Sequence, residues 1–528
     1  MKYLSITSQV PPCEDFKLLH PTPTVVNITF PTVTVPRDLL NDTLRVLNKT
    51  REGPVTIPNA PFIHPWLQGA LLALYATLLV LSILLIAHYV FYARHAKSDP
   101  PDAVGIPTDI SLSIIMPVKN ERPETVADAV KRLSAIPCPG AEVLIVSDDP
   151  LGVYEEIKRA VEALGKPNVK VLRRPSPQGY RGVALNWAAE RAGGDVLVFL
   201  DVDSAPPPDL CQRARSVGER EILFPGWDGY APVDTPIAAL QLFLYKYMLY
   251  YVSIVGRHNT GHPVFALGSG IAVRKKFLIE IGGFCNCTAD DYDISMKAYL
   301  HGGRVAYAPG PPLYVEVPAG YDAFKRQYAR WTYNSAHLLA VYGAKIFKLK
   351  MPLAHRLSVF LNVATHPLMI LTTFSIMLAG VAMGYMGILL LPLNILILQL
   401  ALGVAALMQS YYVYRLAARD GYSFPAVAGK LITSGALLLA LSPYLTLYVL
   451  MGLLKRRIRW YVTPKGLASV AGRLGLYELG LVAVLAALLA YALYISNWVL
   501  ASSAAFLMLA VLYALARVAI PSSQLGRG

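Results

Sequence analysis

The stretch DVLVFLDVD (residues 195–203) decides the fold, because an unbroken apolar run ends directly in two carboxylates. Three comparable runs precede it, LSIIMPV (112–118), EVLIV (142–146) and VKVL (169–172). A polar turn follows each run, and a helical stretch follows most of the turns. Apolar strands that alternate with helices predict an α/β domain with a mainly parallel sheet and helices on both faces.

Polar clusters follow these predicted strands, where ligands bind in parallel sheets. They are KNE (119–121), SDD (147–149) and DVD (201–203), and a fourth cluster, DDYD (290–293), opens a predicted helix. Gathered carboxylates repel one another and are costly to desolvate, so we expect a divalent cation bridged to phosphate. Each cluster alone has a simpler interpretation, such as a turn or a favoured helix N-terminus. Their shared position at strand ends favours a site.

The composition places part of the chain in a lipid bilayer. Of 528 residues, 55% are hydrophobic and only 16% are charged, which is below the share in soluble domains. The net charge of +14 comes largely from basic residues beside apolar runs, as at the cytoplasmic ends of membrane spans. We therefore expect no nucleic-acid partner, and no required protein partner is evident. The five cysteines form no disulfide framework or zinc pattern and are expected to be buried thiols.

The first apolar run, 69–87, is long enough to cross a bilayer at ~20 residues per span, and Arg94 and Lys97 follow it. The positive-inside rule then places the N-terminus outside and the following domain in the cytoplasm of a multi-pass cell-membrane protein. Glycosylation triplets at Asn27, Asn41 and Asn48 agree, because such triplets act only outside the cytoplasm.

One later segment, 431–454, is apolar and long enough to cross. Crossing would put the basic residues at 455–459 and the C-terminus outside, and Pro443 interrupts the segment. We therefore predict a pair of helices in the cytoplasmic interface. The predicted organisation is an extracytoplasmic segment (1–65), a transmembrane helix (66–93), a cytoplasmic α/β domain (94–335), an interface helix (336–357), two transmembrane helices (358–414), interface helices (421–457), a loop (458–466) and two transmembrane helices (474–518).

Further motifs occur in order between residues 111 and 466, which is about two thirds of the chain. They are SIIMPVKNE (113–121), SDD (147–149), RGVALNWA (181–188), DVD (201–203), GSGIAVRKKFLIEIGGF (268–284), ADDYDIS (289–295), QYARW (327–331) and WYVTPKG (460–466). This set resembles glycosyltransferase family 2, the inverting enzymes of the GT-A fold, and most closely its cellulose synthase and hyaluronan synthase branch. Q-x-x-R-W followed by V-T-P-K-G is the most specific part. The departures are Arg181 for the usual lysine, Ala289 and Asp290 for Thr-Glu, and Trp460 for phenylalanine.

The resemblance implies roles for individual residues. Asp291 would be the general base, and Asp201 and Asp203 would hold Mg²⁺ or Mn²⁺ against the donor diphosphate. The acceptor would contact Trp331, Gly268, Ser269 and Asp290, although Trp331 and Trp460 could instead be interfacial anchors. The WYVTPKG segment would be a gating loop. The implied donor-binding residues are Pro117, Asn120, Glu121, Asp148, Asp149, Arg181, Asp201, Gln327, Arg330, Thr463 and Lys465.

The expected function is transfer of a hexose from a nucleotide sugar, GDP-mannose first and a UDP-hexose next, to a polyprenyl- or dolichol-linked glycan. The reaction would occur at the cytoplasmic membrane face, as in the N-glycan assembly of an archaeal cell. The alternative is a processive polysaccharide synthase, for which five predicted spans are few. A non-catalytic nucleotide-sugar exporter or sensor ranks below both, because Asp201, Asp203 and Asp291 are all present.

Overall fold

The computed structural model describes residues 63–96, 110–458, 464, 466–470 and 475–518, and short pieces at 3–4, 35–36, 45, 48–49 and 54–56. A seven-stranded sheet has the order β10-β8-β9-β7-β4-β5-β6. Only β9 runs antiparallel to its neighbours, so the prediction of a mainly parallel sheet is confirmed. The strands are β4 (Leu112–Val118), β5 (Glu142–Ser147), β6 (Val169–Arg173), β7 (Val196–Phe199), β8 (Glu221–Tyr230), β9 (Ile271–Arg274) and β10 (Arg304–Glu316).

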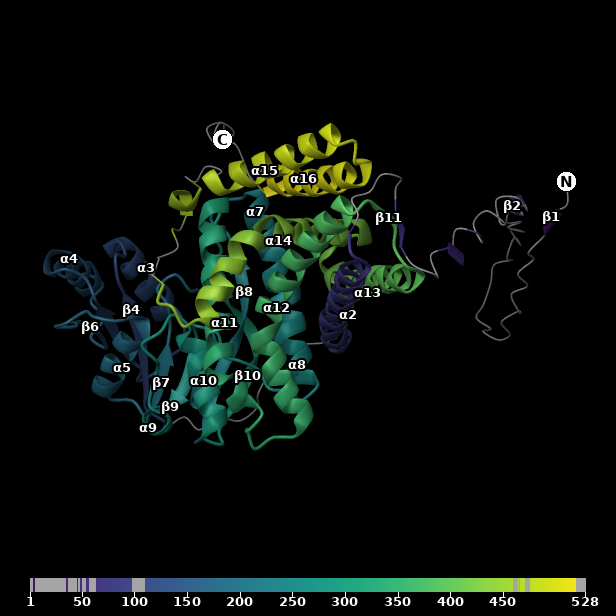
Figure 1. Cartoon of the computed structure of the whole chain (residues 1–528). Coiled ribbons are helices and arrows are strands. Elements are labelled where there is room, and N and C mark those ends of the chain that lie inside the picture. The colour runs from purple at the N-terminus through teal and green to yellow at the C-terminus, as the bar shows by residue number, and fades with distance from the viewer. Residues whose placement is uncertain are drawn as a thin grey trace, which may run out of the picture.

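Helices cover both faces of this sheet (Figure 1). Successive side chains of a strand point to opposite faces, so Ile114 and Met116 pack in one core and Ile115 in the other. The first core includes α3 (Pro123–Ser134), α4 (Leu151–Glu162) and α6 (Leu210–Arg215). The second includes α5 (Arg181–Arg191), α9 (Lys275–Glu280), α10 (Asp290–Leu300) and the end of α11 (Tyr321–Ile346).

Seven helices in the described part of the chain are long and apolar enough to cross a membrane, and the protein is a multi-pass membrane protein. The five predicted spans fall in α2, α12, α13, α15 and α16, and α15 and α16 lie side by side (Figure 1). The two remaining candidate spans are α14 and the segment Pro236–Asn259. That segment is one continuous run of α7 (Pro236–Phe243), the π-helix η1 (Leu244–Val255) and α8 (Gly256–Asn259). The bounds are α2 (Pro65–His95), α12 (Leu353–Tyr385), α13 (Leu393–Ala417, continued by η2, Ala418–Asp420), α14 (Phe424–Leu453), α15 (Leu476–Tyr494) and α16 (Trp498–Val518).

The predicted helix pair over 421–457 is instead the single helix α14, with Pro443 inside it. Proline lacks the N–H that would bond the carbonyl four residues earlier. The Ser442 hydroxyl donates to that carbonyl, of Leu439, at 2.9 Å, so the helix continues. The predicted interface helix over 336–357 is divided between α11, which ends at Ile346, and α12, which begins at Leu353.

Short pieces complete the described chain. They are the antiparallel pairs of β1 (Tyr3–Leu4) with β2 (Val35–Pro36) and of β3 (Val55–Thr56) with β11 (Ile388–Leu390), and the 3-10 helix η3 (Gly466–Ser469).

The expectation that the cysteines are ordinary thiols was wrong for four of them. Cys138 forms a disulfide with Cys211, and Cys285 with Cys287. The Cα atoms of these pairs are 5.4 and 5.3 Å apart, a normal separation for a disulfide. Cys138 and Cys211 are 73 residues apart in sequence and meet only because α3 and α6 cover the same face of the sheet.

Candidate active site

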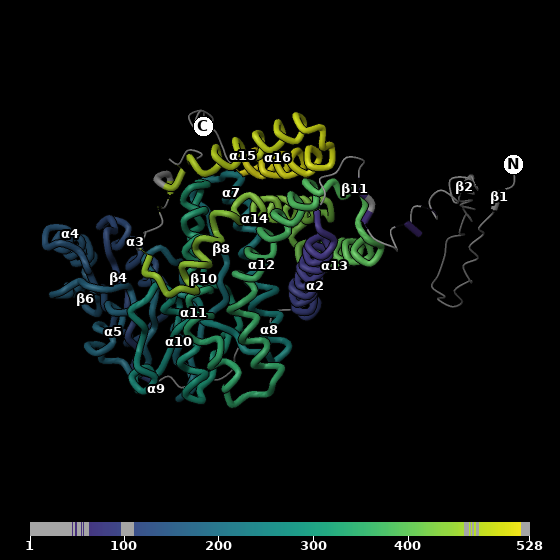
Figure 2. Tube along the Cα trace, viewed as in Figure 1, coloured from purple at the N-terminus to yellow at the C-terminus, as the bar shows by residue number. Residues whose placement is uncertain are grey.

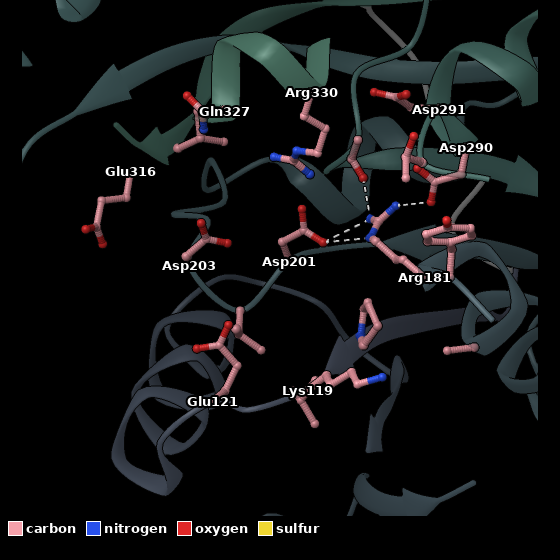
Figure 3. A pocket seen from close by; sticks show the side chains of 18 of the residues that line it. Lys119, Glu121, Arg181, Asp201, Asp203, Asp290, Asp291, Glu316, Gln327 and Arg330 are labelled. Atoms are coloured by element: carbon pink, nitrogen blue, oxygen red, sulfur yellow. Dashed lines mark hydrogen bonds and ion pairs between the residues drawn. The ribbon is translucent and has the colours of Figure 1, made fainter. Parts of the chain in front are cut away.

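A cavity of about 310 Å³ opens at the carboxyl ends of the parallel strands (Figure 3). This volume lies within the range of small-molecule sites. Its lining comes from the ends of β4, β5, β7 and β10, the start of α5 and α10, and one face of α11. The predicted site residues that line it are Pro117, Glu121, Asp148, Arg181, Asp201, Asp203, Gly268, Asp290, Asp291, Gln327, Arg330 and Trp331.

Arg181 joins two of the acidic clusters. Its Nη1 donates to Asp290 Oδ2 at 2.7 Å and its Nη2 to Asp201 Oδ1 at 2.9 Å. Burial acts to lower the pKa of Arg181, but these two carboxylates outweigh burial and raise it. The guanidinium is therefore a fixed positive charge in the cavity.

The start of α5 is held in place by the loop that precedes α10. Asn286 Oδ1 accepts a hydrogen bond from the Tyr180 amide at 2.9 Å. A Cβ atom on Gly182 would lie 2.3 Å from the Cys285 carbonyl oxygen, so only glycine permits this approach. The contact sets the position of Arg181 at the first turn of α5.

Asp291 is the second residue of α10 and faces the cavity. Burial raises its pKa from 3.8 to about 7, and repulsion from Asp290 adds to the rise. Asp290 is buried and paired with Arg181. Two adjacent carboxyl groups thus have different environments, a common arrangement where one of them takes up a proton near neutral pH.

Asp201 and Asp203 lie in the turn after β7, and the structure fixes that turn through its backbone. Ser269 Oγ accepts from the Asp201 amide at 3.0 Å and bonds Ser204 Oγ at 2.7 Å. The Tyr230 hydroxyl donates to the Asp203 carbonyl at 3.0 Å. Ser269, predicted to contact the acceptor, therefore lies beneath the turn and does not line the cavity.

The donor set of this turn fits a divalent cation that also binds phosphate. In the part of the chain that the structure describes, no three acidic, histidine or cysteine side chains converge at the cavity. The chain would thus contribute the two carboxylates of Asp201 and Asp203. Mg²⁺ and similar hard cations are commonly held by one or two carboxylates together with substrate phosphates.

The SDD cluster divides into two environments. Asp148 lines the cavity and accepts two hydrogen bonds from Arg174, each of 2.6 Å. Asp149 lies behind it, where its carboxylate accepts from the Asn120 amide at 2.6 Å and the Ser147 hydroxyl at 2.9 Å. Asn120 has φ 57°, a left-handed conformation that asparagine tolerates better than most residues. Asn120 and Asp149, both predicted to bind the donor, shape the turn and do not line the cavity.

Helix α11 presents Gln327, Arg330 and Trp331 to the cavity. Residues three and four positions apart share one helix face, which explains the Q-x-x-R-W spacing. Gln327 Oε1 is buried and has no hydrogen-bond partner among the described residues, so it is available to a ligand. Thr463 and Lys465 lie outside the described residues, as does Trp460, while Pro464 lines the cavity.

Other lining residues were missed by sequence reasoning. They include Trp227, Tyr245, Glu316 and Asn334, whereas Lys119 belongs to the predicted KNE cluster. Trp227 lies within β8, and its Nε1 donates to the Ser269 carbonyl at 2.8 Å. Glu316 is the last residue of β10, so its position at a strand end could have identified it as a site residue from the sequence.

A family model described as "Glycosyl transferase family group 2" matches residues 196–408. Over 421 residues the chain is 27% identical to a probable glycosyltransferase of Sulfolobus acidocaldarius, covering 76% of this chain and 89% of that protein. The chain is thus similar to the glycosyltransferases of family 2. The matched range contains Asp201, Asp203, Asp291 and the Q-x-x-R-W segment.

Plant relatives are more distant. The chain is 23% identical over 306 residues to probable glucomannan 4-beta-mannosyltransferase 6 of Oryza sativa, covering 52% of each chain. It is 24% identical over 272 residues to glucomannan 4-beta-mannosyltransferase 7 of Arabidopsis thaliana, covering 49% of this chain and 48% of the relative. It thus spans about half the length of these relatives. The solved structure of mannosyltransferase PcManGT from Pyrobaculum calidifontis, in complex with GDP-Man and Mn²⁺, has a TM-score of 0.46 at 17% identity and covers 73% of this chain and 100% of that one.

Proposed function

We propose that this glycosyltransferase moves a hexosyl group from a nucleotide sugar to an acceptor hydroxyl at the cytoplasmic membrane face, with inversion at the anomeric carbon. One observation carries the proposal. Asp291, whose pKa is raised to about 7, shares a cavity with Asp148, Asp201 and Asp203 from two other segments. A base, a diphosphate site and a nucleoside contact are thus available together.

In the proposed reaction the acceptor oxygen forms a bond to the anomeric carbon, and the bond from that carbon to the diphosphate oxygen breaks. The hydroxyl proton passes to the Asp291 carboxylate, and the nucleoside diphosphate leaves. Asp201 and Asp203 would hold Mg²⁺ or Mn²⁺, which when bound stabilises charge on the leaving diphosphate. Arg181 and Arg330 supply further positive charge, and Trp331 offers an apolar face to a sugar ring.

GDP-mannose is the first proposed donor and a UDP-hexose the second. The relatives named as glucomannan mannosyltransferases support a mannosyl donor. The proposed acceptor is a polyprenyl- or dolichol-linked glycan, as in N-glycan assembly. The path of α11 supports this acceptor, because the helix that carries Trp331 packs against α12 and α14, so a substrate held at the membrane surface is close to the cavity.

A processive polysaccharide synthase is the second candidate. Seven membrane-length helices, compared with the five predicted spans, favour it, and so do the glucomannan-synthesising names of the plant relatives. Product length separates the two candidates, because one added sugar indicates a lipid-linked acceptor and a ladder indicates a synthase.

The test is transfer and donor hydrolysis by the purified full-length protein in nanodiscs, across a panel of nucleotide sugars with Mg²⁺ or Mn²⁺. Asp291→Asn should abolish transfer and leave nucleotide binding intact. Glu190→Gln, at an exposed position on α5, is the matched control and should behave as the wild type. Full transfer by Asp291→Asn would exclude Asp291 as the base.

A further inference from the structure

A second, smaller cavity lies between α2, α8 and α12, outside the active site. We call it the Arg257 cavity. Its volume is about 40 Å³. The residues lining it that can donate hydrogen bonds are His88, Tyr89, Tyr92, Ser253, Arg257, Asn362 and Thr365. Within the described part of the chain no carboxylate lines it, so its character is cationic.

Arg257 is buried, with 3% of its surface exposed, and all its partners are neutral. Its Nη1 donates to the Ser358 hydroxyl at 2.6 Å, and its Nη2 donates to His88 Nε2 at 3.0 Å. Since a guanidinium has only donors, that histidine nitrogen must be unprotonated. The guanidinium carbon also lies 4.4 Å from the centre of the Tyr92 ring.

Of the other buried cations in the described chain, three have a carboxylate partner, Arg174, Arg213 and Lys325, whereas Arg215 donates to the backbone carbonyls of Ile110 and Pro139. Arg174 pairs with Asp148 at 2.6 Å, and Lys325 pairs with Glu478 at 2.7 Å. No ion pair joins Arg257 to any described acidic residue. A buried charge without a counter-charge is costly, and arginine cannot become neutral. An anion in the cavity would supply the missing charge.

The size and donors of the cavity fit a phosphate group. A buried water needs about 10–15 Å³, so the cavity of about 40 Å³ has room for about three water-sized groups, enough for the free oxygens of one phosphate group. The Asn362 amide and the Tyr89 hydroxyl have no hydrogen-bond partner among the described residues. Together with the forked guanidinium, they form a donor set suited to phosphate oxygens.

The cavity lies close to the proposed catalytic base. Tyr292 follows Asp291, and burial raises its pKa, while Asp291 raises it further and Arg257 lowers it. Tyr292 therefore lies within the electrostatic reach of both groups. The tube view shows α2, α8 and α12 beside one another (Figure 2), and the cavity residues of α2 lie in its last two turns, before His95. A phosphate bound there would lie near one end of a membrane-length helix.

We propose that the Arg257 cavity binds the phosphate group of a lipid-linked acceptor and thereby anchors that acceptor beside the active site. The assignment to the acceptor rests on the proposed function. The inference that the cavity binds a phosphate group does not rest on the proposed function, because it follows from Arg257 and the hydrogen-bond donors around it. Free phosphate offers the same chemistry, and the experiment separates the two sources.

The experiment measures binding to the full-length protein in dodecyl maltoside by native mass spectrometry and thermal shift. The probes are undecaprenyl phosphate, undecaprenol and inorganic phosphate. Undecaprenyl phosphate should bind and raise the melting temperature, and undecaprenol should not. Arg257→Gln should weaken binding at least about tenfold, since a charge-assisted contact is lost. Asn362→Leu fills the cavity while keeping Arg257 and should weaken binding similarly, even if Arg257→Gln folds poorly.

Arg94→Gln is the matched control, because Arg94 is an exposed arginine on the same helix, α2. It should bind undecaprenyl phosphate as the wild type does. If inorganic phosphate binds as tightly as undecaprenyl phosphate, the cavity is a phosphate site, but a lipid-linked phosphate is excluded as its specific ligand. Equal binding of undecaprenyl phosphate by wild type, Arg257→Gln and Asn362→Leu, or equally tight binding of undecaprenol, would overturn the proposal. Wild-type binding without sugar transfer would count against the proposed function and against the acceptor role, and would leave the assignment of a lipid phosphate to the cavity intact.

Discussion

Substituting Asp290 by asparagine tests how the active site raises the pKa of Asp291. The pKa of Asp291 rises from 3.8 to about 7, first through burial and second through the charge of Asp290. Asparagine removes that charge, yet its amide oxygen can still accept the bond from Arg181 that is 2.7 Å long in the wild type. Because burial accounts for the larger part, we expect the pKa of Asp291 to fall by about one, equivalent to about 1.4 kcal/mol.

The assay is kcat/KM for sugar transfer between about pH 5 and pH 9. The base must be ionised to accept a proton, so wild-type activity should fall on the acid side with a midpoint near the pKa of about 7. At pH 6 a group with this pKa is ionised to roughly 9%, whereas one with a pKa of ~6 is ionised to roughly 50%. Relative to its own plateau, Asp290→Asn should therefore be about fivefold more active than the wild type at pH 6.

Glu316→Gln is the matched control, since Glu316 also lines the cavity but is not among the groups that shift the pKa of Asp291. Its acid midpoint should equal that of the wild type. An unchanged or higher midpoint in Asp290→Asn would refute the argument that Asp290 repels the charge on Asp291.

Three other substitutions test separate parts of the molecule. Asp291→Asn should lower kcat by about 10²–10⁴-fold, which is the usual contribution of a general base. The nucleotide Kd, measured by calorimetry, should not change. A changed Kd with an unchanged kcat would contradict the assigned role. Asp203→Asn should raise the Mn²⁺ concentration for half-maximal activity by roughly tenfold, as metal-site changes commonly do, and an unaltered metal titration would count against a cation at Asp203. Arg174→Met leaves the buried carboxylate of Asp148 unpaired and should lower the free energy of unfolding by about 3–5 kcal/mol. Denaturant unfolding measures this loss, and the double variant with Asp148→Met should recover most of it if the unpaired charge is the cause.

The sheet and most of the candidate site could be predicted because their signals are local. A buried parallel strand is recognised by its apolar run, and the residue after it must lie at the carboxyl edge of the sheet. Asp148, Asp201 and Asp203 were found in this way and line one cavity. Asp291 was found in the DDYD cluster, and the family motifs gave it a role and added the α11 residues, whose spacing is that of one helix face.

Other features depend on contacts between segments far apart in the chain. Pro443 indicates a break in a helix, but the hydroxyl of Ser442 compensates for its missing N–H, and only the helix geometry reveals this bond. Asp148 and Asp149 are adjacent and chemically identical, yet one meets Arg174 at the cavity and the other holds the turn at Asn120.

The sequence by itself determined the class of domain, five of the seven membrane-length helices and the acidic residues at the strand ends, because strand and membrane propensities depend on neighbouring residues. Only the tertiary structure decided which charges are neutralised. Arg181 is paired with Asp201 and Asp290, whereas Arg257 is buried among neutral partners. Burial and Coulomb energy depend on distances through space, which the order of residues along the chain does not specify.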